Sequence, residues 1–117
     1  NRWRRENPER ARASRNASMR RWAATHREEL AARGRRHSLK KKYQITVEQY
    51  ETMLQQQGGV CAICSAAPGK RRLHVDHDHA TRKIRGLLCL RCNVTVGVVE
   101  KRAELLQLAA AYVARHK

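Results

Sequence analysis

The sequence has 117 residues, contains no Phe and carries a net charge of +16, from 26 Lys and Arg against ten Asp and Glu. No apolar run approaches the roughly 18 residues of a membrane span, so we expect no membrane-embedded segment. So large a positive charge predicts a polyanionic partner, with nucleic acid ahead of an acidic membrane surface. A core of this size is marginal, and a bound metal would add folding free energy.

The positive charge is concentrated in the N-terminal third. Residues 1–42 carry 15 Lys and Arg against four Glu, whereas residues 43–117 carry 11 against six acids. Pro8 follows an Asn, which is a typical helix start, and the Ala-rich stretch after it predicts a helix to about Arg33 that Gly34 stops. This helix is either a solvated link or a DNA contact, and the one-sided charge favours DNA.

A basic linker is expected at residues 33–42. Its functional interpretation is phosphate contact, which is compatible with the simpler one of a flexible hinge or a targeting tag. The cations expected to make that contact are Arg35, Arg36, Lys40, Lys41 and Lys42. Residues 1–42 are therefore interpreted as a basic, mainly helical arm and linker that contacts DNA.

The next predicted element is a helix that starts at Thr46, because Thr46 and Gln49 match a capping box. Gly58 and Gly59 are expected to end it. The apolar face of this helix is interpreted as core rather than as a site, and consists of Val47, Tyr50, Met53 and Leu54.

The C-terminal half is expected to contain a β-hairpin followed by two helices. The predicted strands are residues 73–77 and 84–88. The first helix is short, at residues 90–98, and the second is amphipathic, at residues 100–115. The apolar stripe of this last helix is expected to be either core or the seam of a dimer.

Four cysteines form two Cys-x-x-Cys pairs, Cys61 with Cys64 and Cys89 with Cys92. Two such pairs can supply four thiolates to one tetrahedral Zn²⁺, and a site with four thiolates is closed and structural. Disulfides or free thiols are the alternatives, but no signal-peptide pattern is present, which favours metal in a reducing compartment. We therefore expect a structural zinc that joins the hairpin to the helix after it.

A polar cluster lies between the two cysteine pairs. Asp76, His77, Asp78 and His79 are consecutive, and Asn93 directly follows the last cysteine. Oxygen ligands suit Mg²⁺ or Mn²⁺, so Asp76 and Asn93 are candidates to hold a catalytic cation. Histidine titrates near neutral pH, which makes His77 the candidate general base. Successive strand residues point to opposite faces, so Asp76 and His77 serve one site only if the strand ends or bends there.

Three motifs stand in a fixed order along the chain: Gln-Gly-Gly-Val-Cys-Ala-Ile-Cys at 57–64, Val-Asp-His-Asp-His at 75–79 and Arg-Gly-Leu-Leu-Cys-Leu-Arg-Cys-Asn at 85–93. In this order they resemble the recombination endonuclease VII family, a branch of the HNH or ββα-metal nucleases of phages and bacteria. The resemblance covers about residues 43–97.

This resemblance implies a fold for the middle of the chain. The expected fold class is α+β and mostly helical, with a zinc-stabilised ββα-metal (HNH) core at residues 43–99. The resemblance says little about the rest, where charge and periodicity predict a long basic helical arm at residues 1–42 and an amphipathic helix at residues 100–117.

The resemblance also implies roles for the site residues. Asp76 and Asn93 would hold a divalent cation, and His77 would activate the water that attacks phosphorus. His79 would be an auxiliary active-site residue in contact with phosphate or metal. No Asn lies between the Asp-His cluster and the last cysteine, so the middle position of the HNH triad is vacant or filled by another group.

Several cations near the cluster are candidates to contact DNA. Arg82, Arg85 or Arg91 would steady the charge of the scissile phosphate, and the sequence does not choose among them. Lys83 is a further expected DNA contact.

The leading hypothesis is a metal-dependent DNA endonuclease that acts on double-stranded or branched DNA in the cytoplasm of a bacterial or phage-infected cell. The alternatives are a non-catalytic zinc-containing DNA-binding module and an RNA-directed or ribosome-associated basic zinc protein. Only the first explains Asp76, His77 and Asn93 together. Symmetric cleavage of a junction would need two active sites, and the sequence leaves monomer or homodimer open.

Overall fold

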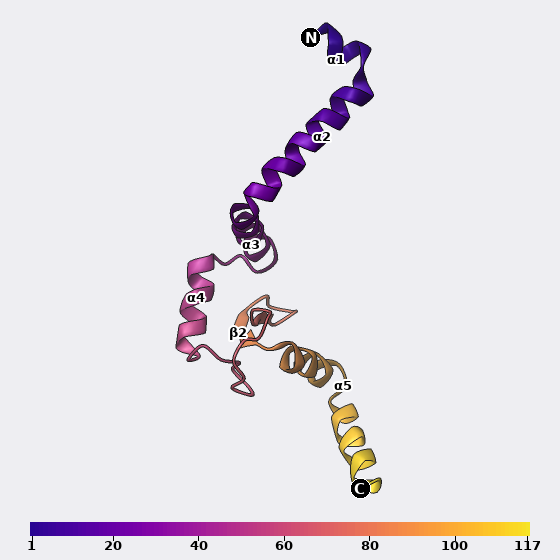
Figure 1. Cartoon of the computed structure of the whole chain (residues 1–117). Helices are drawn as coiled ribbons and strands as arrows, with labels where there is room; N and C mark the ends of the chain where they lie inside the picture. Colours follow the sequence, from indigo (N-terminus) through magenta and orange to yellow (C-terminus); the bar gives the residue numbers. More distant parts are fainter.

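Two helical arms extend from a small central body (Figure 1). The computed structural model describes residues 1–117, with extents of 74 × 35 × 29 Å and a radius of gyration of 22.2 Å. A compact domain of this length has a radius of gyration of about 13 Å, so most of the helical surface is not packed against a core. The elements in chain order are α1 (Arg2–Glu6), α2 (Pro8–Thr25), α3 (Arg27–Tyr43), α4 (Val47–Gln56), β1 (His74–His77), β2 (Ile84–Leu88) and α5 (Leu90–Arg115).

The N-terminal arm breaks at His26 and not at Gly34. The Thr25 hydroxyl donates to the Trp22 carbonyl at 2.9 Å, and the His26 ring stacks on Trp22 at 4.3 Å, which ends α2. The prediction that Gly34 stops the helix was wrong, because Gly34 lies inside α3 with open space around it. A single Gly costs a helix about 1 kcal/mol, which strong helix formers on both sides offset.

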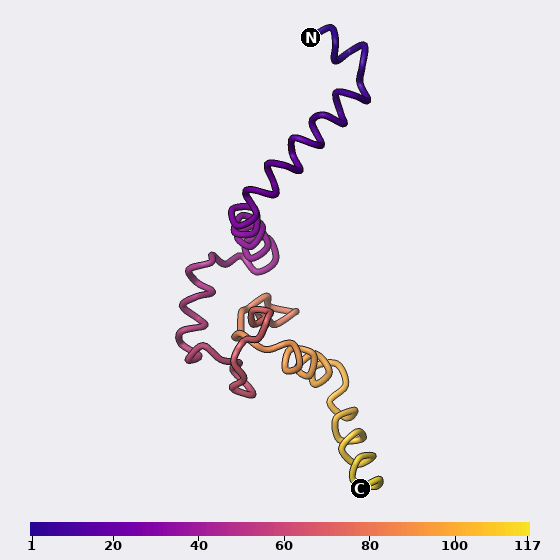
Figure 2. Tube along the Cα trace, in the orientation of Figure 1, coloured from indigo at the N-terminus to yellow at the C-terminus, as the bar shows by residue number.

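The segment interpreted as a basic linker is therefore helical. Residues 33–42 form the last turns of α3, which ends where Gln44 takes a left-handed backbone with a φ of 59°. The tube in Figure 2 shows α2 lying across the view and α3 seen nearly along its axis, so the arm turns between these helices before it reaches the body of the molecule. The arm is thus a continuation of the core and not a tether, because buried Leu39 of α3 belongs to the core.

The core lies where α3, α4 and the hairpin meet. Helix α4 has the predicted capping box, in which the Thr46 hydroxyl accepts from the Gln49 backbone N–H at 3.1 Å and the Gln49 side chain accepts from the Thr46 N–H at 2.8 Å. Its apolar face packs on the core as predicted. The buried cluster consists of Leu39, Ile45, Tyr50, Cys61, Leu73, Val75, Leu87 and Leu88.

Tyr50 and Arg35 fix the corner between α3 and α4. The Tyr50 hydroxyl donates to the Leu73 carbonyl at 2.6 Å, and burial raises the pKa of Tyr50. The Arg35 guanidinium lies 4.8 Å from the centre of the Tyr50 ring and pairs with Glu51 at 3.0 Å. The arm is therefore held at a defined angle to the core.

Strands β1 and β2 pair antiparallel with an irregularity at the polar cluster. Asp76 lies opposite Gly86 and His77 lies opposite Ile84, so Arg85 is the extra residue of a β-bulge. The predicted range of β2 is confirmed, and β1 begins one residue later than predicted. A bulge bends the strand and re-aims its side chains. The irregularity falls at the Asp76–His77 step, where the sequence required the strand to end or bend, and its extra residue lies on β2.

Helix α5 consists of two helical segments separated by a kink, so the two predicted helices are present, with the break at Arg102 rather than at residue 99. Arg102 has non-helical φ and ψ angles of −152° and 67°. No residue of α5 is buried, and its apolar side chains past the kink are at least 40% exposed. The stripe is therefore not part of this chain's core, and its use as a dimer seam stays a prediction. None of the helices is long and apolar enough to cross a membrane.

Candidate metal centre and active site

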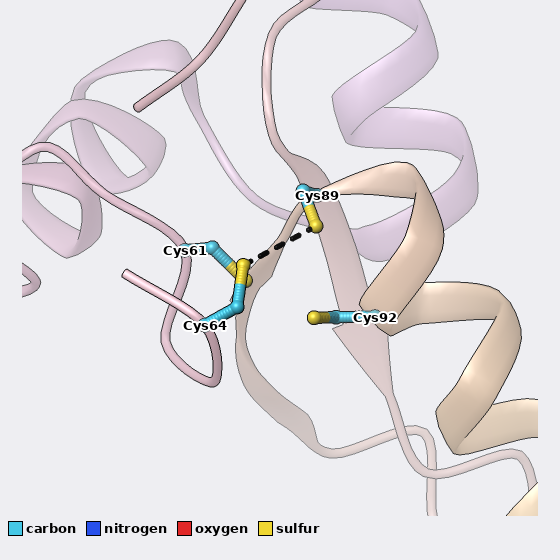
Figure 3. Close-up of side chains that lie close together, drawn as sticks. All are labelled: Cys61, Cys64, Cys89 and Cys92. Carbon is cyan, nitrogen blue, oxygen red and sulfur yellow. Dashed lines mark hydrogen bonds between the residues drawn. The ribbon is translucent and has the colours of Figure 1, made fainter. Parts of the chain in front are cut away.

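The four cysteines converge on one point. Their Sγ atoms all lie within 4.8 Å of one another, and those of Cys64 and Cys89 are 3.7 Å apart (Figure 3). Four sulfurs at about 2.3 Å from one tetrahedral Zn²⁺ lie about 3.8 Å from each other, whereas a disulfide needs about 2.05 Å. All four thiols are free. The predicted grouping into one site is confirmed, and its geometry fits zinc.

Local backbone geometry brings the two pairs together. The loop that carries Cys61 closes through the Ser65 N–H, which donates to the Cys61 carbonyl at 3.0 Å, and Ser65 has a φ of 61°. The Ala62 N–H donates to the Leu87 carbonyl of β2 at 3.1 Å, which fastens this loop to the hairpin. Cys89 caps the N-terminus of α5, so any metal in the cage joins loop, hairpin and helix.

The thiols of the cage differ in acidity. Burial raises the pKa of Cys61, but the backbone N–H groups of Cys64, Cys89 and Ile63 outweigh it and lower the pKa to about 6. The hydrogen bond with Cys89, with burial next, raises the pKa of Cys92 to about 12. Sulfurs this close do not all ionise unless a cation compensates their charge.

Asp76 is buried and already paired. Its side chain is 12% exposed, and Arg85 contacts both carboxylate oxygens, at 2.8 Å through Nε and at 2.9 Å through Nη2. The third donor of Arg85, Nη1, pairs with Glu100 of α5. These pairings raise the pKa of Arg85, with the Asp76 hydrogen bond as the largest cause. A cation that binds Asp76 would therefore compete with Arg85 for the same carboxylate.

His77 lies between two aromatic rings. The Tyr43 ring meets it edge-on at 5.4 Å between centres, and the His79 ring lies at 4.7 Å. His77 is half-buried and His79 is exposed. The sequence offered no sign that Tyr43, 34 positions earlier and at the end of the arm, would contact His77. The structure thus brings the rings of His77 and His79 together and adds Tyr43.

Asn93 lies in the first turn of α5, on the side that faces the hairpin. Its backbone N–H donates to the Cys89 carbonyl at 2.9 Å, and the residue is half-buried. Asn93 and Glu100 are seven residues apart and so lie on one face of the helix. Because Glu100 pairs with Arg85 of β2, that face is turned toward Asp76.

Asp78 builds the hairpin loop. Its Oδ1 accepts from the backbone N–H groups of Ala80 at 2.8 Å and Thr81 at 2.9 Å. These bonds, that of Thr81 first, lower the pKa of Asp78. The turn is completed by Arg82, whose φ is 63°. Asp78 thus shapes the loop beside the site.

The cations that the sequence singled out fall into two groups. Arg35 and Arg85 are engaged, with Tyr50 and Glu51 in the first case and with Asp76 and Glu100 in the second. The exposed group consists of Arg36, Lys40, Lys41, Lys42, Arg82, Lys83 and Arg91.

A basic hollow lies beside the cysteine cage, and of its cations only Arg91 was among the expected DNA contacts. It has a volume of about 760 Å³ and is lined by the loop after Cys64 and by the start of α5. Its charged lining residues are all cations: Lys70, Arg71, Arg72 and Arg91. The cluster of three consecutive cations in the loop was the available sequence signal.

The chain is a small α+β protein with a basic helical arm. Its four cysteines form a possible metal site where the β-hairpin meets the helix that follows it. The family model of recombination endonuclease VII matches residues 36–115, and the chain belongs to this family. The resemblance to this family is thereby confirmed. The match extends beyond residues 43–97 on both sides.

Two curated phage proteins are similar to the chain. The Gene 59 protein of Mycobacterium phage D29 is 45% identical over 98 residues, which are 80% of this chain and 59% of that protein. The Gene 59 protein of Mycobacterium phage L5 is 45% identical over 73 residues, which are 61% of this chain and 44% of that protein. The chain thus spans about half the length of these relatives. No solved structure matches it.

Proposed function

We propose that this chain is a metal-dependent DNA endonuclease of the HNH type that hydrolyses phosphodiester bonds in double-stranded or branched DNA. The observation that supports the proposal is that Asp76 and His77 lie on β1 and Asn93 lies in the first turn of α5, a helix that packs on the hairpin, in a chain of the recombination endonuclease VII family. A non-catalytic zinc-containing DNA-binding module would need the cage and the positive charge but not these three side chains.

The cysteine cage has a structural role in this proposal. Cys61, Cys64, Cys89 and Cys92 would hold Zn²⁺, and four thiolates leave no position for substrate. Their arrangement fastens β2 to the start of α5, which fixes where Asn93 stands relative to Asp76. The division into an arm at 1–42, a nuclease core at 43–99 and a C-terminal helix at 100–117 is part of the same proposal.

The donor atoms of Asp76 and Asn93 fit a hard divalent cation. Both offer oxygen, the ligand that Mg²⁺ and Mn²⁺ prefer. A cation there would supply Lewis-acid stabilisation of the scissile phosphate and of the leaving 3′-oxygen. Asp76 would hold it most readily when Arg85 moves away from one of its oxygens.

His77 would take the proton from the attacking water. The rings of Tyr43 and His79 lie against its imidazole and restrict its orientation, which a general base requires. His79 would act beside it as an auxiliary contact to phosphate. Hydrolysis by this route leaves a 5′-phosphate and a 3′-hydroxyl.

DNA contact is assigned to the exposed cations. Arg36, Lys40, Lys41 and Lys42 lie on the end of α3, and Arg82, Lys83 and Arg91 lie near the hairpin and α5. Arg35 is less suited, because Tyr50 and Glu51 already hold its guanidinium. We place the reaction in the cytoplasm of an infected cell, since both curated relatives are phage proteins.

Cleavage of supercoiled plasmid tests the proposal. The zinc-loaded chain should nick or linearise DNA in Mg²⁺ or Mn²⁺ and not in EDTA. His77→Ala should lower the cleavage rate at least about 100-fold, because general-base catalysis contributes about 10²–10⁴. Zinc content, thermal melt and DNA affinity should stay as in the wild type.

The outcome separates the two functions. Tight DNA binding without cleavage under any cation would favour the non-catalytic module. Cleavage by His77→Ala at the wild-type rate would refute the assignment of the base while leaving the nuclease. Junction substrates then show whether branched DNA is preferred over plain duplex.

A further inference from the structure

Arg85 connects the two halves of the proposed catalytic site. Its Nε and Nη2 donate to the two carboxylate oxygens of Asp76, at 2.8 and 2.9 Å, while Nη1 pairs with Glu100. The fork thus covers both oxygens of the carboxylate that we propose as a cation ligand. Each oxygen keeps a second lone pair, but a cation bound there would lie close to the positive guanidinium, so cation binding becomes more favourable when Arg85 moves away from Asp76.

The fold holds these three residues in place. Arg85 is the extra residue of the β-bulge opposite the Asp76–His77 step, so the irregularity of the strand is what aims its side chain. Asp76 is 12% exposed, whereas Arg85 and Glu100 are 35% and 33% exposed. The buried carboxylate of Asp76 therefore depends on Arg85 for charge compensation, while Glu100 is more exposed to solvent.

Glu100 offers Arg85 a second carboxylate on the same helix face as Asn93. The helix is regular between these two positions, because its kink lies further on, at Arg102. A guanidinium that leaves Asp76 therefore finds a partner without leaving the site. Its N–H groups released from Asp76 become available to a phosphate oxygen.

We propose that Arg85 is handed over from Asp76 to Glu100 when a divalent cation binds, which makes Glu100 a positioning residue of the site. The inference rests on the proposed function, since it takes Asp76 as a cation ligand. It also chooses Arg85, among the three candidate arginines, as the group that contacts the scissile phosphate. Without a cation, Arg85 neutralises the buried carboxylate and keeps the hairpin folded.

The affinity for Mn²⁺ is the quantity that reports the handover. Arg85→Lys keeps the positive charge but loses the two-pronged contact, so the cation meets a weaker competitor. We expect Mn²⁺ to bind about three- to tenfold more tightly to this variant. Glu100→Gln removes the receiving carboxylate, and we expect Mn²⁺ to bind about three- to tenfold more weakly.

A plain charge effect gives a different pattern. Loss of a negative charge near the cation would weaken binding in Glu100→Gln, but it would leave Arg85→Lys unchanged. In an Arg85→Ala background nothing remains to be handed over, so adding Glu100→Gln should change the Mn²⁺ Kd less than about twofold. A charge effect would weaken binding equally in both backgrounds.

The measurement is a titration of the zinc-loaded full chain with Mn²⁺, followed by the electron paramagnetic resonance signal of the free ion. Asp76→Asn identifies the binding step that belongs to the site. Glu104→Gln and Arg102→Lys are matched controls, because they form an exposed ion pair on the same helix at 3.1 Å. Both controls should bind Mn²⁺ as the wild type does.

The outcomes distinguish the handover of Arg85 from the proposed cation site itself. Tighter binding by Arg85→Lys together with weaker binding by Glu100→Gln supports the handover. Unchanged affinity in both, with binding lost in Asp76→Asn, overturns the handover and leaves the proposed cation site. Wild-type affinity in Asp76→Asn overturns both. If Arg85→Ala loses zinc or its cooperative melt, the opposite shifts of the other two variants still carry the test.

Discussion

Gln57 shows how much of the core depends on single side chains. Its Nε2 donates to the carbonyls of Val60 and Leu87, both at 2.9 Å, and its Oε1 accepts from the Leu87 N–H at 2.8 Å. The side chain thus pairs with the backbone of β2 as a neighbouring strand would. A Cβ on Gly86 would lie 3.3 Å from the same Oε1, so the two positions are matched.

We predict that Gln57→Glu lowers the free energy of unfolding by about 2–4 kcal/mol. The variant loses both N–H donors and sets a charged oxygen against two carbonyl oxygens in a half-buried place. Gln56→Glu, the same change on the exposed neighbour, should stay within about 0.5 kcal/mol of the wild type. Urea unfolding of the zinc-loaded proteins measures both, and equal midpoints would show that the Gln57 contacts contribute nothing.

The sequence did not predict side-chain contacts between residues far apart in the chain. The spacing of the cysteines was enough to predict their convergence, because two Cys-x-x-Cys pairs have few other uses. Nothing in the chain near Arg85 indicates that it holds Asp76 and Glu100, since those contacts arise from the bulge and from the direction of α5. The same holds for Tyr43 against His77.

Among the elements, those with local end signals were predictable. Helix α4 starts at its capping box, and it ends before Gly58 and Gly59, whose φ values are 69° and 76°. The end of α2 was missed because it depends on the stacking of His26 on Trp22 rather than on a helix-breaking residue. Helix α5 was split one turn too early, since nothing at Arg102 marks the kink.

The junction of loop, hairpin and α5 depends on the cysteine cage. We predict that Cys89→Ser releases zinc and abolishes the cooperative thermal transition, because the free energy of metal binding is comparable with the whole stability of a small domain. Scanning calorimetry with a zinc assay measures this, and chelation of the wild type should reproduce it. Ile63→Ser is the control, since Ile63 is 59% exposed within the same loop. An unchanged melt in Cys89→Ser would contradict a structural metal.

At the scale of the whole molecule, shape and charge point to the same use of the arm. The long dimension of 74 Å comes from helices that leave the core, and residues 1–42 carry 15 of the 26 Lys and Arg. The arm buries only Ala11 and Leu39, and all of its cations except Arg35 are exposed to a polyanion. Because Leu39 is core and Arg35 holds Tyr50, substitution tests the arm more cleanly than deletion.

We predict that replacing Lys40, Lys41 and Lys42 by Gln weakens DNA binding and lowers the salt dependence of the binding constant. Each phosphate contact contributes about 0.9 to the slope of log K against log salt, so the loss should be about 2–3. The control is the replacement of Lys101, Arg115 and Lys117 by Gln, which removes the same charge from exposed positions in the C-terminal part of the chain. Fluorescence anisotropy with labelled duplex at several salt concentrations gives both slopes. Equal losses in the two triple variants would mean that net charge, and not the end of the arm, attracts the DNA.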